Sequence, residues 1–499
     1  MAAETRFVQR PEIEDANVRR RAIERARDRG VALPTFAELA GFTPISEAVL
    51  DRVARVDPDA PDAANLWRIN WFNAPDRRSR VSLPDHLVLP PQLTGVEAPI
   101  VVLLGSRFPM IGAHKVLPAY ACLVTRLVVG GFDPADQRAV WPSTGNYCRG
   151  GVAVSRILGC SGVAVLPEGM SRERFEWLAG WVSDSSDIVR TIGTESNVKE
   201  IYDKCHELES DPRNVILNQF SAFANYMAHR ACTGAAVADV FKRMQREAPR
   251  RKLAAFVSAT GSAGTIAAGD HLKEALGAKI VAVEALECPT LLENGYGEHN
   301  IQGIGDKHVP LIHNVMNTDV VVAVSDSISD RLNLLFNTPE GLAWLEDELC
   351  LEPEVIGALG EIGLSGLANI AASIKLARHM GYGPDDVVAT VATDSARLYR
   401  TEAPLARKKY FGDETAKISA ETIWSTCVGA LSNDHVLELD QQQRRRIFNL
   451  GYYTWVEQQG VALEDFDRRK DQAFWGEIGR SIPAWDGLIK SFNAEAGLQ

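Results

Sequence analysis

Residues 252–285 are "KLAAFVSATGSAGTIAAGDHLKEALGAKIVAVEA". An apolar run, "KLAAFVSA", leads into a turn of small residues, then into the helix-forming "TIAAGDHLKEAL", and then into a second apolar run, "AKIVAVEA". Two short runs rich in apolar residues, joined by one helical segment, are typical of a βαβ unit with parallel strands. The stretch therefore predicts an α/β fold.

The same alternation recurs on both sides of this unit. Further strands are predicted at "APIVVLLGS" (98–106), "RAVWPS" (138–143), "CSGVAVLP" (160–167), "SDIVRTI" (186–192) and "DDVVATVAT" (385–393). Helical segments such as "SRERFEWLAGWV" and "SNVKEIYDKCHEL" separate several of them. This order predicts several βαβ units and more than one parallel sheet.

Bulk composition limits the class of protein. The chain has 499 residues, which predicts two or three domains, and it is 46% hydrophobic and 24% charged, as globular proteins are. Its net charge of −12 argues against nucleic acid or an anionic membrane as the main partner. We find no membrane-spanning apolar run, and the N-terminus lacks the pattern of a signal or transit peptide.

Cysteine and histidine usage points to a reduced compartment and away from a metal site. The eight cysteines are scattered without a CxxC pair. His299, His308 and His313 lack the spacing of metal ligands, so no metal is expected. We expect a cytoplasmic protein.

A lone lysine stands in the apolar segment "PMIGAHKVLPAY" (109–120). Lysine is seldom buried unless it is paired or used, although an exposed head on an apolar stem is the ordinary alternative. Lys115 is therefore a candidate functional residue.

Two strand-to-helix loops carry further candidates. In "PSTGNYCRGG" (142–151), Ser143, Thr144 and Asn146 place hydroxyl and amide groups at a helix start, which suits a carboxylate; a plain N-cap is the alternative. In "SATGSAGTIAAGD" (258–270), small residues let backbone N–H groups approach an anion, although close packing alone would also favour them. The second loop is neither a P-loop nor a good GxGxxG match.

The order of these three features is informative. An amine that can form an imine, a carboxylate loop and an anion loop on one α/β scaffold are the parts needed to handle an amino acid with pyridoxal 5'-phosphate.

Beyond this, residues 89–402 resemble the fold-type II pyridoxal-phosphate enzymes, the group of cysteine synthase, cystathionine β-synthase, threonine dehydratase and tryptophan synthase β. The matching segments occur in order. They are "GAHK", "STGNYC", "LPEGMSRERFEWL", "NQFSAFANYMAH", "SATGSAGT", "IQGIGDKHVP", "GLSGLAN" and "VATDSARLY".

The resemblance implies two three-layer α/β/α domains with mainly helical extensions at both ends. The expected boundaries are an N-terminal extension over 1–85, a cofactor-binding core over 86–400 with a smaller mobile subdomain near 118–230, and a C-terminal extension over 401–499. It also implies a homodimer that acts on a small amino acid.

The resemblance assigns roles residue by residue. Lys115 is the expected catalytic residue and holds the cofactor. The cofactor is expected to contact His114, Asn146, Gly261, Ser262, Ala263, Gly264, Thr265 and Ser395, with the Ser395 hydroxyl at the pyridine nitrogen. The substrate is expected to contact Ser143, Thr144, Gly145, Asn146, Tyr147 and Gln219. Asp394, beside Ser395, is a competing candidate for the ring nitrogen.

These roles imply β-elimination or β-replacement, through an aminoacrylate, on cysteine, an O-substituted serine or a similar amino acid. A neutral hydroxyl at the ring nitrogen favours loss of a β-substituent over transamination. A serine or threonine dehydratase or racemase is the alternative, and a non-catalytic cofactor-binding protein is a third.

The sequence also departs from the family pattern. Ala263 stands where glycine is usual, Val-Leu follows Lys115, and about eighteen extra residues lie around 343–361. The loop "STGNYC" holds no acid, which argues against the indole chemistry of tryptophan synthase β.

Overall fold

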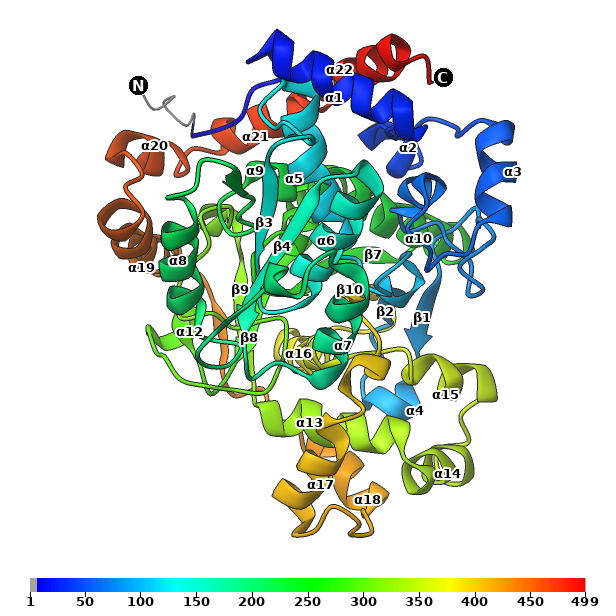
Figure 1. Cartoon of the computed structure of the whole chain (residues 1–499). Helices are drawn as coiled ribbons and strands as arrows, with labels where there is room; N and C mark the ends of the chain where they lie inside the picture. Colours follow the sequence, from blue (N-terminus) through cyan, green and yellow to red (C-terminus); the bar gives the residue numbers. More distant parts are fainter. Residues whose placement is uncertain (1–6, 499) are drawn as a thin grey trace.

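Two β-sheets form the centre of the molecule in the computed structural model, which describes residues 7–498 (Figure 1). The larger sheet has seven strands in the order β1-β2-β10-β7-β8-β9-β11. Its two edge strands, β1 and β11, are antiparallel to their neighbours, and the five central strands are parallel. The strands are β1 (His86–Leu89), β2 (Ile100–Leu104), β7 (Lys252–Ala259), β8 (Lys279–Ala285), β9 (Val320–Val324), β10 (Asp386–Ala392) and β11 (Val436–Glu438).

The smaller sheet has four parallel strands in the order β5-β4-β3-β6. They are β3 (Arg138–Pro142), β4 (Ser161–Pro167), β5 (Ile188–Thr191) and β6 (Asn214–Ile216). Parallel strands need a crossover between them, and helices supply it in both sheets. The chain therefore contains two α/β units, one inserted between β2 and β7 of the other.

Helices cover both sheets and make up most of the two ends of the chain. Before and between the first strands lie α1 (Ala16–Arg29), α2 (Phe36–Leu39), α3 (Glu47–Arg55) and α4 (Pro91–Thr94). The central part contains α5 (Val116–Val129), α6 (Asn146–Leu158), α7 (Arg172–Trp181), α8 (Val198–Leu208), α9 (Phe223–Ala228), α10 (Gly234–Glu247), α11 (Ala268–Leu276), α12 (Thr290–Glu293), α13 (Asp326–Asn337), α14 (Pro339–Asp347), α15 (Pro353–Leu359) and α16 (Leu364–Met380). The C-terminal part contains α17 (Glu402–Phe411), α18 (Ala420–Trp424), α19 (Gln441–Tyr452), α20 (Leu463–Arg468), α21 (Gln472–Arg480) and α22 (Ile482–Ala496).

Helix α5 lies in the interior, which explains the apolar sequence around Lys115. All of its residues except Arg126 are buried, and it packs against α6, α9, α1 and α22. Lys115 is its N-cap, and Gly130, in the left-handed region, ends it. A helix enclosed on all sides is expected to be apolar all round, so the lone lysine at its start is conspicuous.

The two ends of the chain meet. Helices α1 and α22 lie side by side at the top of Figure 1. Arg19 forms an ion pair of 2.8 Å with Glu495, and Asn493 exchanges hydrogen bonds with the backbone of Leu33. The C-terminal helix α22 thus packs against the N-terminal helices α1 and α2 and against α5.

The α/β fold class and the predicted strands are confirmed. The strands predicted from the sequence do not include β1, β6, β9 or β11, and β11 adds a strand to a part of the chain predicted as mainly helical. The domain boundaries stay a prediction. Within residues 7–498 no single helix has the length and composition of a membrane span. Helices α15 and α16 have that length and composition only when they are taken together, and the pair is bent by 116°.

Candidate active site

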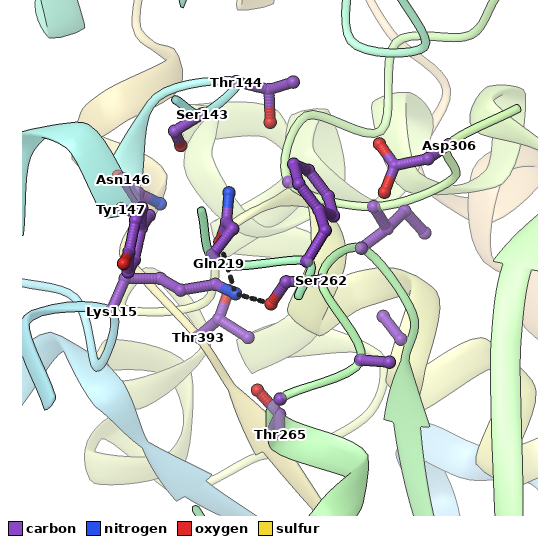
Figure 2. Close-up of a pocket in the computed structure, with 17 residues that line it drawn as sticks. Lys115, Ser143, Thr144, Asn146, Tyr147, Gln219, Ser262, Thr265, Asp306 and Thr393 are labelled. Carbon is purple, nitrogen blue, oxygen red and sulfur yellow. Dashed lines mark hydrogen bonds between the residues drawn. The ribbon is translucent and has the colours of Figure 1, made fainter. Parts of the chain in front are cut away.

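One pocket brings together Lys115 and both predicted loops. Figure 2 shows Lys115 reaching into it from the start of α5. The pocket is lined by Lys115, Ser143, Thr144, Asn146, Tyr147, Gln219, Phe220, Ala259, Gly261, Ser262, Ala263, Gly264, Thr265, Gly303, Ile304, Asp306 and Thr393. It therefore contains all the predicted site residues except His114, Gly145 and Ser395.

The Lys115 amine is held at the centre of this pocket. Its Nζ donates to Ser262 Oγ over 2.9 Å and to Gln219 Oε1 over 3.4 Å. Burial lowers the pKa of Lys115 to about 8, and the nearby carboxyl groups only partly oppose this. An amine with that pKa exists in part as the free base at neutral pH, which is the form that attacks a carbonyl group.

The loop of residues 261–264 joins β7 to a short 3-10 turn, Thr265–Ala267, that leads into α11. Its four backbone N–H groups donate no hydrogen bond to any part of the described chain. A Cβ atom on Gly264 would lie 2.0 Å from Asn225 Oδ1, and one on Gly261 would lie 2.6 Å from the Gly303 carbonyl oxygen. Small residues are thus required here, and free N–H groups at a helix start suit an anion.

Ala263 adopts φ +58°, in the left-handed region. This conformation is easy for glycine and costs an L-residue about 1–2 kcal/mol. Residue 263 thus has the backbone conformation that suits glycine, the usual residue of the family at this position. Ala263 keeps this conformation and adds a methyl group.

The hydroxyl and amide loop lies between β3 and α6. Ser143 Oγ accepts from the Gly145 N–H over 3.0 Å. Gly145 has φ +145°, and the Arg174 side chain fills the space where its Cβ would be, so both features require glycine. Asn146 donates from Nδ2 to Asp394 Oδ2 over 2.6 Å. These contacts fix the loop against the wall of the pocket.

His114 lies directly behind Lys115 and is fully buried. Burial, and after it the Lys115 charge, lowers the pKa of His114 to about 3, so the imidazole is neutral. Its Nδ1 lies 3.2 Å from the Thr393 carbonyl oxygen and its Nε2 lies 2.8 Å from Thr265 Oγ1. Because a carbonyl only accepts, Nδ1 carries the hydrogen and Nε2 accepts from the Thr265 hydroxyl. His114 therefore supports the anion loop from behind.

Ser395 and Asp394 follow Thr393 but do not line the pocket. Ser395 Oγ accepts from the Arg397 N–H over 3.3 Å, and its own O–H has no acceptor within residues 7–498. The Asp394 carboxylate accepts from Asn146 and, over 2.7 Å, from the Tyr399 hydroxyl, and it lies 3.8 Å from Arg174. Asp394 is thus held within a buried network, and the Ser395 hydroxyl keeps a hydrogen to donate.

Asp306 is a pocket residue that sequence patterns did not single out. It lies in "IQGIGDKHVP", which served only as a landmark of the resemblance. The available signal was an acid following a glycine-rich apolar stretch. Glu195, which is 1% exposed, is a second buried acid that was missed.

These residues fit pyridoxal phosphate. A phosphate needs unpaired donors, and residues 261–264 supply four free N–H groups. An aldehyde needs an amine with a lowered pKa, and Lys115 supplies one that already touches this loop.

The comparisons with known proteins agree with this reading. A family model described as "Pyridoxal-phosphate dependent enzyme" matches residues 87–343. Cysteine synthase B of Campylobacter jejuni is 30% identical over 270 residues, which are 53% of this chain and 78% of that protein. A cysteine synthase of Staphylococcus aureus is 26% identical over 272 residues, 54% of this chain and 77% of that protein.

A solved structure adds support for the fold. A hydrogen sulfide-producing enzyme from Fusobacterium nucleatum superposes with a TM-score of 0.53 over 71% of this chain and all of that chain, at 18% identity. The family match covers more than half of the chain and includes Lys115 and both loops. The chain belongs to the family of pyridoxal-phosphate-dependent enzymes.

Proposed function

We propose that the enzyme removes or replaces the β-substituent of a small L-amino acid such as cysteine or an O-substituted serine. The observation that carries this proposal is the placement of the Lys115 amine, which contacts the anion loop at Ser262 and the substrate-side residue Gln219 at once. One amine between a phosphate cradle and a carboxylate loop is the arrangement that this chemistry needs. The cysteine synthases named above, which align over more than three quarters of their length, support the same choice.

When bound, pyridoxal phosphate supplies a ring that withdraws electrons from the α-carbon of an attached amino acid. Lys115 would hold the cofactor and, once displaced by the substrate amine, would remove the α-proton with its Nζ. A pKa near 8 suits both tasks, since the amine can accept a proton and return it at neutral pH.

The two loops would orient the reactants. The free N–H groups of residues 261–264 would bind the phosphate, and Thr265, whose hydroxyl donates to His114, would lie beside it. Ser143, Thr144 and Gln219 would bind the substrate carboxylate, with Asn146 and Tyr147 beside them. Holding the carboxylate fixes the direction of the bond from the α-carbon to its hydrogen, so that Lys115 can reach that hydrogen.

Ser395 remains the predicted partner of the pyridine nitrogen. Its free O–H could donate there while its oxygen keeps the Arg397 N–H. A hydroxyl at this position supports elimination over transamination, because it leaves the ring less protonated than a carboxylate would.

The proposal extends to a homodimer in the cytoplasm. The eight cysteines are all free, which supports a reducing compartment. Sedimentation at several protein concentrations tests the dimer.

A substrate panel tests the function. The protein, loaded with cofactor, is incubated with analogues of cysteine, serine and threonine, and sulfide, ammonia and keto acid are measured. Turnover of cysteine or O-acetylserine supports the proposal. Turnover restricted to serine or threonine, or change of α-carbon configuration alone, supports a dehydratase or racemase. A visible cofactor band without turnover of any analogue supports a non-catalytic binding protein.

A further inference from the structure

Asp306 gives the active site an acid that the roles above do not use. It lines the same pocket as Lys115, and Figure 2 shows the two side chains entering from different sides. It is 6% exposed, and its Oδ2 has no hydrogen-bond partner in the described part of the chain. A buried carboxyl oxygen without a donor destabilises the fold, so its retention at the edge of an active site points to a role in the reaction.

The surroundings of Asp306 favour its protonated form. Burial raises the pKa of Asp306 well above its usual range, the neighbouring Glu195 raises it further, and Lys115 opposes both. Burial likewise raises the pKa of Glu195 to about 7. Tyr202 and Cys288 also face Asp306, and burial raises the pKa of each, so both stay neutral at pH 7. These surroundings favour the protonated carboxyl group of Asp306 over its carboxylate.

The backbone of Asp306 and of the segment after it is fixed by hydrogen bonds from Thr290 and from the C-terminal part of the chain. The Thr290 hydroxyl donates to the Asp306 carbonyl oxygen over 3.1 Å. Trp455 Nε1 donates to the Val309 carbonyl oxygen over 2.7 Å, and Arg469 donates to that of Leu311 over 2.7 Å. An acid that serves in proton transfer must be held in place, and these contacts hold the loop that carries it.

We propose that Asp306 is the catalytic acid and base for the β-substituent, and that the substrates are amino acids whose β-substituent takes up a proton as it leaves, namely a thiol or a hydroxyl group. This rests on the proposed function. As the bond between the β-carbon and the substituent breaks, the electron pair goes to the sulfur or oxygen, which takes the Asp306 proton and leaves as a neutral thiol or water. The Asp306 carboxylate then accepts a proton from the entering nucleophile as its bond to the β-carbon forms, or from water.

The test compares leaving groups that need a proton with one that does not. The holoenzyme and its Asp306→Asn variant are assayed with L-cysteine, L-serine and β-chloro-L-alanine, whose chloride leaves without a proton. We expect Asp306→Asn to lower kcat/KM for cysteine by about 100-fold or more and that for chloroalanine by less than about 5-fold. The visible band of bound cofactor should be unchanged, and Asp306→Glu should recover part of the cysteine activity.

The pH profile supplies a second measurement. With cysteine, wild-type kcat/KM should fall at high pH as Asp306 loses its proton, and this limb should be absent with chloroalanine. Asp347→Asn, on an exposed position of α14, is the matched control and should change neither profile.

The outcomes separate the two proposals. If the wild type turns over neither these substrates nor O-acetylserine, the proposed function is wrong. If the wild type turns them over and Asp306→Asn slows all of them equally, or slows none, the role of Asp306 is wrong while the proposed function stands.

Discussion

Lys115 Nζ lies 2.9 Å from Ser262 Oγ, so the lysine at the start of α5 touches the loop that follows β7. The two residues are 147 positions apart in the chain and come from elements on different sides of the pocket. The contact places an amine of lowered pKa next to four free backbone N–H groups. This juxtaposition is the basis of the predictions below.

Gly264→Ala should weaken cofactor binding. The new Cβ would meet Asn225 Oδ1 at 2.0 Å, and Asn225 cannot turn away without losing its hydrogen bonds to Gln219 and Ser262. We expect the dissociation constant of pyridoxal phosphate to rise by about tenfold or more, as the loss of one or two hydrogen bonds would produce. Titration followed by absorbance measures it.

Gly487→Ala is the control for this change. Gly487 lies within α22, and a Cβ there has open space around it. The substitution should leave cofactor affinity unchanged and stabilise the helix by roughly 0.5–1 kcal/mol. Equal effects of the two variants on affinity would contradict the role given to the loop.

His114 should make the protein sensitive to acid. Its pKa is about 3 in the folded protein, against an ordinary value of 6.5, so below pH 6.5 the unfolded chain takes up a proton that the folded chain does not. This contribution to stability is therefore present above pH 6.5 and declines as the pH falls toward 3, by roughly 1.4 kcal/mol per unit.

Urea unfolding at pH 7, 6 and 5 measures this slope. His114→Gln should flatten it in part, because burial also lowers the pKa values of other histidines, which keep the rest of the slope. These are His229, His271, His299, His308 and His313. His206→Gln, at an exposed position on α8, should leave the slope as it is. An unchanged slope in His114→Gln would show that this imidazole is not kept neutral by the fold.

Trp455→Phe should reduce both stability and activity. It removes the indole N–H that pairs the Val309 carbonyl oxygen, which costs about 1–3 kcal/mol when that oxygen stays buried. It also loosens the segment after Asp306, so sulfide release from cysteine should fall more than elimination from chloroalanine.

Trp485 supplies the control. It is equally buried, and its N–H has no acceptor within residues 7–498. A matching loss of cysteine activity in Trp485→Phe would refute the specific link to Asp306.

Ser395→Ala should change the spectrum of the bound cofactor without releasing it. The variant removes the O–H predicted to face the pyridine nitrogen, and kcat should fall by about tenfold, the effect of one lost hydrogen bond. Ser373→Ala removes a buried hydroxyl that bonds only the Asn369 carbonyl oxygen in α16, and should affect neither quantity. If Ser395→Ala leaves the spectrum unaltered, the ring nitrogen has another partner, and Thr393 would be the next hydroxyl to test.

The sequence predicted those parts of the structure that depend on local patterns. Apolar runs such as 252–259 and helix starts such as that of α6 were found because periodicity and small residues mark them. Strand β6 has only three residues and β11 lies in a polar region, so neither has a pattern of its own. Strand β9, "VVVAV", differs from these two, because its apolar and β-branched residues are typical of a buried strand.

The candidate site divides in the same way. Lys115 and the two loops stand out as residue types in an unusual setting. Asp306 and Glu195 do not, because an acid is ordinary in a sequence and becomes unusual only when the fold buries it and leaves one of its carboxyl oxygens without a hydrogen-bond partner. Thr393 lines the pocket and Ser395, two residues later, does not. This difference likewise depends on the fold, because Ser395 caps the turn that begins at Ala396.

The central claim is that Lys115 carries the cofactor, and borohydride reduction followed by peptide mapping tests it most directly. Borohydride fixes an imine between a lysine and pyridoxal phosphate as a stable amine. We expect one phosphopyridoxyl group per chain, on Lys115, and none on Lys115→Ala. A modified lysine elsewhere in the wild-type protein, or no modification of cofactor-loaded protein, would contradict it.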